Sequence, residues 1–358
     1  MAQGARLKGL VLSGGTGSRL RPFTYSTAKQ LLPLANKPVL FYVIEAMVEA
    51  GITDIGVVVG STAEQITAAL GDGSRFGAEL SYVPQDAPRG LAHAVQTARP
   101  FLGDDPFAVF LGDNLLRGGI AGTVEAFAAG TSDAQLLVKP VPNPSEFGIA
   151  ELHGDGSVRR LIEKPAAPAS NLAILGVYML RRRFFEAAQT IRPSARGELE
   201  ITDALQAMID GGMEVCARVV EEDWIDTGSP LDLLAANRML LCDPRTYEGY
   251  VRLEGTPDDA PVQIAADVRL SGTQLTGPAI IGRATEIADS RIGPGTSIGA
   301  GCRIRGATID ESIVMDGAVV EGARLRNSII GRGAVVRGGG DGAFEGLLLG
   351  DAGRVELV

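Results

Sequence analysis

The sequence predicts an α/β domain, built on a mixed and mostly parallel sheet, that is followed by a parallel β-helix. Up to about residue 240, short β-rich apolar runs alternate with segments of helical length, which indicates βαβ units. From about residue 261 to 338, long helical patterns are missing and short "xIG" units recur. A polar, proline-bearing stretch connects the two regions. We therefore expect a first domain over 1–240, a linker over 241–260, and a β-helix with a C-terminal tail over 261–358.

Two helices of the first domain carry recognisable end signals. "PVLFYVIEAMVEAG" (38–51) has Pro38 near its start and Gly51 at its end, the usual positions of these residues in a helix. "STAEQITAALG" (61–71) begins with Ser61, and a glutamate follows three residues later. This spacing predicts that Ser61 caps the helix.

The other elements of the first domain continue the alternation. The expected strands are "LKGLVLS" (7–13), "DIGVVVG" (54–60), "ELSYVPQ" (79–85), "PFAVFLGDN" (106–114) and "AQLLVKP" (134–140), and the expected helices are "GLAHAVQTA" (90–98) and "GTVEAFAAG" (122–130). "GIAELHGDGSVRRLIEKP" (148–165) departs from this rhythm, because its "GDG" lies between two alternating segments and predicts a hairpin turn.

The region after residue 261 follows a hexapeptide pattern. Ile292, Ile298 and Ile304 recur at six-residue steps, and the spacing then varies between five and six through Ile309, Val314, Val320, Leu325 and Ile330. Such a pattern with glycine turns is typical of a parallel β-helix, whose coils are stable only when stacked. An unrelated glycine-rich sandwich is the alternative. The tail "RGGGDGAFEGLLLGDAGRVELV" is only partly covered by the pattern and is left unassigned.

Composition excludes several classes of function. A formal net charge of −10 argues against nucleic acid as a partner, since such binding needs a basic face. No apolar run approaches the roughly 20 residues that a membrane span requires, and the apolar run at the N-terminus is too short for a secretory signal. Three scattered cysteines fit reduced thiols, so we expect a cytoplasmic protein.

A glycine cluster at the end of the first strand predicts a phosphate site. Gly14, Gly15 and Gly17 let backbone N–H groups approach phosphate oxygens closely. Arg19 and Lys29 follow, and no carboxylate occurs in this part of the chain to neutralise them. A flexible strand-to-helix turn is the alternative for the glycines alone, whereas the two cations favour a polyanionic ligand.

Two familiar phosphate motifs do not fit the spacing. A Walker P-loop needs a lysine directly after its last glycine, and none follows Gly17. A dinucleotide fingerprint needs a third glycine where Leu20 stands.

The stretch "LSGGTGSRLRPFTYSTAKQLLP…NKP" resembles the signature of the sugar-1-phosphate nucleotidylyltransferases, and its "KQLLP" is similar to the version found in glucose-1-phosphate thymidylyltransferases. Further matches follow in the same order: "PQDAPRGLAHA", "FLGDN", "FGIAEL", "EKP", "GELEITD" and "DWIDTGSPLDLL". The similarity covers residues 6–240, and the added β-helix resembles the long form associated with deoxysugar pathways of antibiotic-producing actinomycetes.

This resemblance implies a fold, a reaction and partners. The fold is a Rossmann-like nucleotidyltransferase domain with a C-terminal left-handed β-helix that supports a homo-oligomer. The reaction converts dTTP and glucose 1-phosphate into dTDP-glucose and pyrophosphate with Mg²⁺. A uridylyltransferase that uses UTP with glucose or N-acetylglucosamine 1-phosphate is the alternative.

The resemblance also assigns roles to residues of this chain. It implies catalytic roles for Arg19, Lys29 and Lys164, and nucleotide contacts for Leu12, Gly14, Gly15, Thr16, Gly17, Gln30, Gln85, Gly90 and Asp113. It implies sugar-phosphate contacts for Gly148, Glu163 and Lys164, and magnesium ligation by Asp113 and Asp226. Gln85 can read a pyrimidine edge because its amide both donates and accepts hydrogen bonds. Adjacent strand residues point to opposite faces, which sets a difficulty for Glu163 and Lys164 acting together.

The chain departs from the usual pattern at two positions and leaves two other classes open. Arg89 and His93 stand where the shorter relatives commonly have Asp and Gln, and we expect His93 to pack in its helix. Hexapeptide β-helices also occur in acyltransferases, but these use a histidine base and none follows residue 154 here. A catalytically inactive regulatory subunit is the third alternative, and the presence of the cations and aspartates together argues against it.

Overall fold

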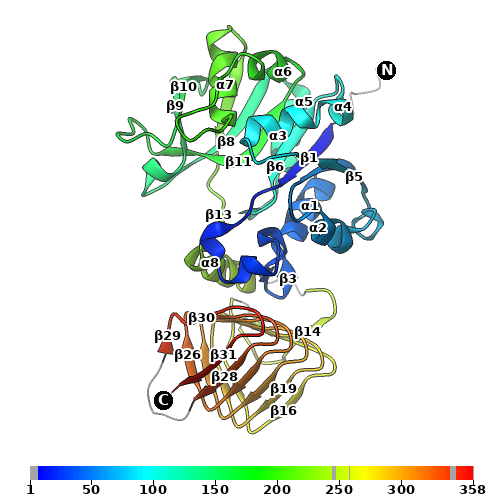
Figure 1. Cartoon of the computed structure of the whole chain (residues 1–358), viewed down its shortest axis with the longest axis vertical. Coiled ribbons are helices and arrows are strands. Elements are labelled where there is room, and N and C mark those ends of the chain that lie inside the picture. Colours follow the sequence, from blue (N-terminus) through cyan, green and yellow to red (C-terminus); the bar gives the residue numbers. More distant parts are fainter. Residues whose placement is uncertain (1–6, 244–246, 258, 339–343, 358) are drawn as a thin grey trace. The chain divides into compact units, whose positions relative to one another are not determined.

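The computed structural model describes residues 7–243, 247–257, 259–338 and 344–357 (Figure 1). The chain divides into two compact units, each made of two pieces of sequence. The first unit spans residues 1–16 and 40–226, and the second spans 17–39 and 227–358. The contiguous division around a linker at 241–260 stays a prediction, and each unit is described separately below.

The first unit is built on a mixed sheet of nine strands, in which a path of seven has the order β10-β9-β11-β6-β1-β4-β5. The strands are β1 (Lys8–Ser13), β4 (Asp54–Val59), β5 (Glu79–Pro84), β6 (Phe107–Leu111), β8 (Ala134–Pro140), β9 (Gly148–Leu152), β10 (Val158–Glu163), β11 (Leu172–Leu180) and β12 (Val215–Val219). Strands β6, β1, β4 and β5 run parallel, whereas β11 pairs antiparallel with β6 and β8. A separate ribbon pairs β7 (Asn114–Leu116) with β13 (Trp224–Asp226).

Helices follow the parallel strands, as the alternating pattern predicts. They are α1 (Val39–Glu49), α2 (Ala63–Leu70), α3 (Leu91–Thr97), α4 (Arg99–Leu102), α5 (Ala121–Ala129), α6 (Arg183–Ala188) and α7 (Ile201–Asp210), with short 3₁₀ turns at Ser74–Phe76 and Pro144–Glu146. The central strands are buried because helices and neighbouring strands enclose them: Leu10, Val11 and Val109 have no exposed surface. Apolar residues on both faces of a strand are expected for a covered parallel sheet.

The second unit contains the β-helix, whose short strands form three parallel sheets. The sheets contain β14 (Tyr250–Arg252), β15 (Val262–Ala265), β18 (Ala279–Ile281), β21 (Thr296–Ile298), β24 (Ile313–Val314), β27 (Ile329–Ile330) and β30 (Leu348–Leu349); β16 (Arg269–Ser271), β19 (Glu286–Ala288), β22 (Arg303–Arg305), β25 (Val319–Glu321), β28 (Val335–Gly338) and β31 (Arg354–Leu357); and β17 (Gln274–Leu275), β20 (Arg291–Ile292), β23 (Thr308–Asp310), β26 (Arg324–Arg326) and β29 (Phe344–Glu345). Strand β14 alone pairs antiparallel, with β15.

The second unit also holds the segment 17–39 and helix α8 (Pro230–Leu241). The segment forms three 3₁₀ turns, at Ser18–Leu20, Phe23–Tyr25 and Lys29–Leu31, and then a small hairpin of β2 (Pro33–Leu34) and β3 (Lys37–Pro38). A stretch of sequence that lies between two elements of the first unit therefore belongs to the compact unit that contains the β-helix.

The predicted fold class is confirmed in both parts. A mixed, mostly parallel sheet with helices is present, and stacked parallel strands replace the sandwich alternative. The hairpin predicted around "GDG" is confirmed by the antiparallel pairing of β9 with β10. The predicted cap at Ser61 is wrong: Thr62 is the residue that precedes helix α2, and its side chain makes no capping hydrogen bond.

The tail that the pattern left unassigned continues the β-helix. Strand β30 pairs with β27 and β31 pairs with β28, which adds one more coil. Residue spacing explains why the pattern failed, because Ile329 pairs with Leu348 across 19 positions, whereas Ile313 and Ile329 are 16 apart. Part of the longer coil, residues 339–343, lies outside the described residues.

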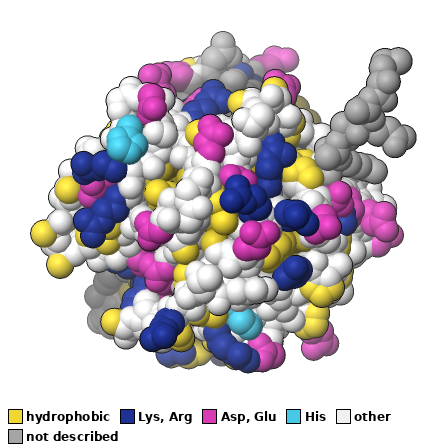
Figure 2. Space-filling view, turned by 90° about the horizontal axis from the view of Figure 1, so that it is seen from above, with side chains coloured by type: hydrophobic (Ala, Val, Ile, Leu, Met, Phe, Trp, Pro, Cys, Tyr) yellow, Lys and Arg dark blue, Asp and Glu magenta, His cyan; other side chains and the backbone are white. Residues whose placement is uncertain are grey.

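The surface carries both signs of charge. On the face in Figure 2, Lys and Arg side chains are interspersed with Asp and Glu side chains, so neither sign dominates this face. Among the described helices, none combines the length and the apolar character needed to cross a membrane.

The stacked apolar interior of the β-helix generates a stability prediction. Ile309 has no exposed surface and pairs in register with Ile292 below and Leu325 above. Truncation to alanine in Ile309→Ala leaves a cavity that neighbouring coils cannot fill, which is expected to cost about 2–5 kcal/mol. Urea unfolding of the full chain measures this loss. Arg303→Ala, at an exposed position of β22, is the control and should change stability by less than about 0.5 kcal/mol; similar losses in both variants would contradict the assigned interior.

Candidate active site

The carboxyl ends of the parallel strands in the first unit carry the predicted nucleotide residues. Gly14, Gly15 and Thr16 directly follow β1, Gln85 follows β5, and Asp113 lies two residues after β6. Parallel strands that are neighbours in a sheet end at the same edge, where ligands of open α/β sheets bind. Leu12 belongs to the buried core, and its backbone carbonyl accepts a hydrogen bond from Gly112.

The side chain of Gln85 lies over the glycine bend. A Cβ atom placed on Gly14 would be 2.9 Å from Gln85 Oε1, so a larger residue at position 14 would displace this amide. On the other side, Gln85 Nε2 is 3.0 Å from His93 Nδ1 in helix α3. The expectation that His93 only packs in its helix is therefore incomplete, because its ring also contacts the predicted base-reading amide.

The loop before α3 requires glycine for a structural reason. Gly90 has a φ of +105°, and a Cβ there would be 2.4 Å from the carbonyl oxygen of Leu199. Backbone hydrogen bonds join this loop to the same residue, from Leu199 N to Arg89 O (2.7 Å) and from Ala92 N to Leu199 O (3.0 Å). Close backbone packing thus accounts for Gly90, whether or not a base also approaches it.

The two predicted metal ligands face one amide. Strand β13 pairs antiparallel with β7, so that Asp226 lies opposite Asn114, the residue after Asp113. Asn114 Nδ2 lies 3.3 Å from Asp113 Oδ1 and 3.5 Å from Asp226 Oδ1. Asn114 Oδ1 in turn accepts a hydrogen bond from Trp224 Nε1 (2.8 Å). The structure therefore brings together two aspartates that are more than 100 positions apart in the sequence.

This donor set suits a small hard cation. Asp113 is buried and Asp226 is half-buried, and both offer carboxylate oxygens. Magnesium is commonly held by one or two carboxylates, with phosphate oxygens and water as its other ligands. Within the described parts of the chain, no group of three or more His, Cys, Asp or Glu side chains could hold a metal ion by itself. The residues present fit Mg²⁺ bound jointly with a phosphate ligand.

The predicted sugar-phosphate residues lie at the end of the β9–β10 hairpin. Strand β10 ends at Glu163, and Lys164 has a φ of +42°, in the left-handed region. The alternation of strand side chains therefore stops at Glu163, and the geometric difficulty for this pair does not apply. Gly148 pairs with Glu163 in the hairpin, and a Cβ there would be 3.1 Å from Glu163 Oε2 and 3.0 Å from Thr202 Oγ1.

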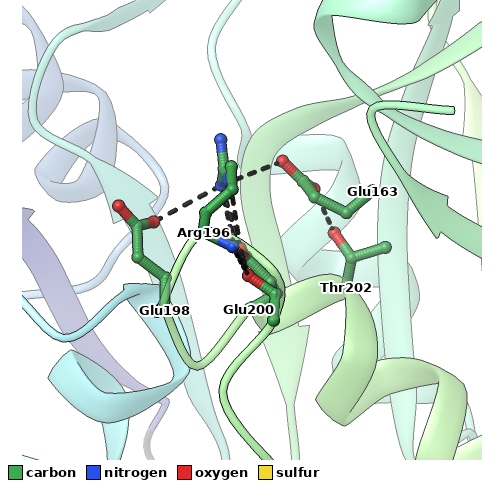
Figure 3. A network of polar contacts seen from close by, with 6 residues as sticks. Glu163, Arg196, Glu198, Glu200 and Thr202 are labelled. Atoms are coloured by element: carbon green, nitrogen blue, oxygen red, sulfur yellow. Dashed lines mark hydrogen bonds and ion pairs between the residues drawn. The ribbon is translucent and has the colours of Figure 1, made fainter. Parts of the chain in front are cut away.

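A polar network surrounds Glu163 (Figure 3). Thr202 Oγ1 donates to Glu163 Oε2 (2.8 Å), and Arg196 Nη2 lies 3.4 Å from Glu163 Oε1. The same guanidinium binds both carboxylate oxygens of buried Glu200 at 3.0 Å. Burial raises the pKa of Glu163, while the hydrogen bond from Thr202 acts in the opposite direction.

Sequence reasoning missed four polar side chains of this region, although each stands in a quoted motif or next to one. Asn114 follows the aspartate of "FLGDN", Thr202 lies in "GELEITD", Trp224 lies in "DWIDTG", and Arg196 directly precedes "GELEITD". Each also has a partner distant in the sequence, and the local pattern does not reveal those contacts. The adjacency of Asn114 and Asp113 was the one signal available.

The remaining predicted residues lie in the second unit. Gly17 has a φ of +64°, and a Cβ there would be 2.8 Å from Lys29 Cβ, so the glycine packs against the stem of that lysine. Arg19 is exposed and Lys29 is half-buried. Gln30 is 1% exposed, and its Oε1 has no hydrogen-bond partner among the described residues.

The chain is similar to known proteins over most of its length. The nucleotidyl transferase family model matches residues 8–242. The chain is 47% identical over 321 residues to a glucose-1-phosphate thymidylyltransferase of Streptomyces griseus, a match that covers 88% of both chains.

Solved structures give the same picture for the first part of the chain. A structure from Bacillus anthracis that carries the same enzyme name has a TM-score of 0.61 at 34% identity and covers 65% of this chain and 94% of that one. A UDP-glucose pyrophosphorylase complexed with UDP-glucose has a TM-score of 0.59 at 26% identity, covering 65% and 98%. The chain therefore belongs to the nucleotidyl transferase family, among the glucose-1-phosphate thymidylyltransferases.

Proposed function

We propose that this protein transfers a thymidylyl group from dTTP to glucose 1-phosphate, forming dTDP-glucose and pyrophosphate. The observation that carries the proposal is the convergence of Asp113 and Asp226 on Asn114 at the edge where the parallel strands end. A pair of carboxylates at this position suits a nucleotide bound with a divalent cation. The identity to the Streptomyces griseus enzyme over most of both chains supports the choice of substrates.

In this reaction a phosphate oxygen of the sugar phosphate attacks the α-phosphorus of the nucleotide, and pyrophosphate leaves. Both reactants are anions, so alignment and neutralisation of charge supply most of the catalysis. We propose that Arg19 and Lys29 bind the triphosphate and the departing pyrophosphate, and that Lys164 binds the sugar phosphate. No covalent nucleophile is needed for this direct displacement.

Asp113 and Asp226 would hold Mg²⁺, whose chemistry when bound is that of a Lewis acid toward phosphate oxygens. Asn114 contributes by fixing the two carboxylates, because its amide hydrogens can face both while Trp224 holds its oxygen. A loss of Asn114 would thus act through the aspartates.

The sugar is expected to meet Glu163 and the backbone at Gly148. The carboxylate of Glu163 can accept hydrogen bonds from sugar hydroxyls while Thr202 and Arg196 keep it oriented. A side chain at Gly148 would crowd the Glu163 carboxylate, because its Cβ would be 3.1 Å from Glu163 Oε2.

The base is expected to meet Gln85, whose amide can pair with the O4 and N3–H edge of a pyrimidine. Thymine and uracil share this edge, so UTP is the alternative nucleotide and differs by one methyl contact. We further propose a cytoplasmic homo-oligomer assembled through the β-helix, in which dTDP-glucose formation is the first step toward deoxysugars.

The direct test measures pyrophosphate release from dTTP, UTP, GTP and ATP, each with a small panel of hexose 1-phosphates. We expect the highest kcat/KM for dTTP with glucose 1-phosphate. A preference for UTP would establish the alternative, and a preference for a purine nucleotide would refute the assignment of the base site.

The paired aspartates predict a metal-dependent loss of activity. Asp226→Asn removes one of the two negative charges, and we expect kcat to fall about 100-fold at moderate Mg²⁺ with partial recovery at higher Mg²⁺. Asp223→Asn is the matched control, because Asp223 is exposed and its carboxylate pairs with exposed Arg117 (3.5 Å). Near-normal turnover and an unchanged Mg²⁺ requirement in Asp226→Asn would remove this residue from the metal site.

The raised pKa of Glu163 predicts a pH dependence of sugar binding. Above this pKa the carboxylate accepts hydrogen bonds from the sugar, and as the pH falls through it the group is protonated and loses that ability. The KM for glucose 1-phosphate should therefore begin to rise at a higher pH than an ordinary glutamate, with its pKa of about 4.3, would produce.

Steady-state rates between about pH 8 and pH 5 measure this rise in the KM for glucose 1-phosphate. Glu163→Gln should raise the KM at the higher pH and make the KM less dependent on pH. Glu49→Gln, at an exposed position of α1, should leave the pH dependence of the KM unchanged. If the KM of Glu163→Gln depends on pH as that of the wild type does, another group is responsible for the rise.

The contact between His93 and Gln85 predicts an effect on nucleotide use. Nδ1 of His93 accepts from Gln85 Nε2 when the ring proton is on Nε2, which lies 3.8 Å from Asp86 Oδ1. His93→Leu removes this acceptor and frees the amide to rotate, so kcat/KM for dTTP should fall about fivefold. His93→Gln keeps an acceptor and should remain close to the wild type in initial-rate assays; equal rates for the leucine variant would contradict the role.

A further inference from the structure

The segment 17–39 carries Lys29, yet it packs in the same compact unit as the β-helix. Lys29 lies in the 3₁₀ turn Lys29–Leu31, which is too short to fix its own orientation. The contacts that hold this turn therefore come from elsewhere in the second unit. The described residues supply two groups of such contacts, one that spans the turn and one that holds the hairpin after it.

The first group comes from the last two coils of the β-helix. Asp351 Oδ2 accepts hydrogen bonds from Ser26 Oγ (2.6 Å) and Thr27 Oγ1 (3.4 Å). Arg332 Nη1 donates to Thr27 Oγ1 (2.8 Å), and its Nη2 donates to the carbonyl of Leu31 (3.4 Å). Thr27 and Leu31 stand two positions before and two positions after Lys29. The guanidinium thus spans the turn that carries the lysine.

The two carboxylate oxygens of Asp351 have different roles, as an earlier coil of the β-helix shows. Asp351 Oδ1 accepts from the backbone N–H of Arg332 (2.7 Å), just as Asp316 Oδ1 accepts from Ala300 N (2.8 Å). This bond joins successive coils and belongs to the construction of the β-helix. The second oxygen of Asp351 is the one that reaches the segment 17–39.

The second group holds the hairpin that follows Lys29. Its two turn residues, Ala35 and Asn36, have φ values of 44° and 63°, a strained conformation for alanine. Ala35 N donates to Asn237 Oδ1 of helix α8 (2.9 Å), and buried Asn237 donates onward to Gly295 O (3.1 Å). Asn36 Nδ2 donates to Ile298 O in the β-helix (2.8 Å).

The part of the segment that precedes both anchors packs against Lys29. The stem of Lys29 packs on Gly17, and Thr24 Oγ1 donates to Gly17 O (2.7 Å). The turn that contains Arg19 is therefore tied to Lys29 through Gly17. A displacement of either anchor would be passed to both cations.

We propose that the β-helix positions the phosphate-binding cations of this enzyme, and that Arg332 and Asp351 are positioning residues that act through Lys29. This proposal rests on the proposed function, since it takes Lys29 to bind the triphosphate and the pyrophosphate. It gives the β-helix a task within each chain, in addition to any part in assembly.

The test uses the full chain with Arg332→Ala, Asp351→Ala and the double substitution, assayed in both directions of the reaction. Misplacement of Lys29 should raise the KM for dTTP, and for pyrophosphate in the reverse direction, about tenfold, because small shifts of a charged contact are costly. The KM for glucose 1-phosphate should change less than about twofold. Both residues serve one network, so the double variant should be little worse than either single variant.

Matched variants separate positioning from folding. Arg337→Ala removes an exposed arginine five positions further along the same coil, whose bond is to Glu321, and should leave every KM unchanged. Arg332→Lys keeps the charge but loses the fork that reaches both Thr27 and Leu31, and should be intermediate. Thermal unfolding midpoints of all variants show whether a kinetic change follows a loss of the fold.

The proposal is overturned if Arg332→Ala and Asp351→Ala keep the wild-type KM for pyrophosphate, or if Arg337→Ala shows the same rise. An equal rise in the KM for all substrates that tracks a lowered unfolding midpoint also overturns it, since the residues would then serve folding alone. Lys29→Ala distinguishes the two levels of inference. If that variant binds pyrophosphate normally, the role given to Lys29 fails; if it does not and Arg332→Ala does, only the positioning role fails.

Discussion

The arrangement of the candidate site in the first unit depends on the position of strand β1 between β4 and β6. This strand is hydrogen-bonded on both sides, to β4 and β6, and all three strands run parallel. A strand closed on both edges and covered on both faces is accessible only at its ends, and ligands of open α/β sheets bind at the carboxyl end. That end carries Gly14, and the ends of β5 and β6 bring Gln85 and Asp113 to the same edge of the sheet. The chemistry of the site is thus assembled from the points where buried strands stop.

Much of this could be predicted from the sequence, because the signals concerned are local. Apolar runs, helix-length segments and the six-residue steps of Ile292, Ile298 and Ile304 each reflect a repeat of backbone geometry, and the sheet and the β-helix confirm them. The residues of the long N-terminal signature were sufficient to identify the family. Each of Asp113 and Asp226 could be placed at the end of a strand from the sequence, but the resemblance was needed to pair them, since nothing in the local sequence reveals that β7 and β13 are neighbours.

What could not be predicted depends on partners distant in sequence. Asn114 reads as an ordinary polar residue until Trp224 and both aspartates are placed around it. Glu163 and Lys164 looked incompatible because strand alternation was assumed to continue, whereas the left-handed backbone at Lys164 ends it. The final coil escaped the pattern because its 19-residue spacing interrupts the shorter repeat. In each case long-range packing or one unusual dihedral angle overrode a local rule.

The division of the chain also bears on how the protein is made. Thr27 and Arg332 are 305 positions apart, and Ser26 and Asp351 are 325 apart. At a translation rate of about 5–20 residues per second, a ribosome needs roughly 15–60 s to deliver the second member of such a pair. During this interval the nascent segment has emerged without the coils that later hold it. The contacts of Ser26 and Thr27 with Asp351 can form only after the last coil has been made, so this part of the second unit is completed late in synthesis.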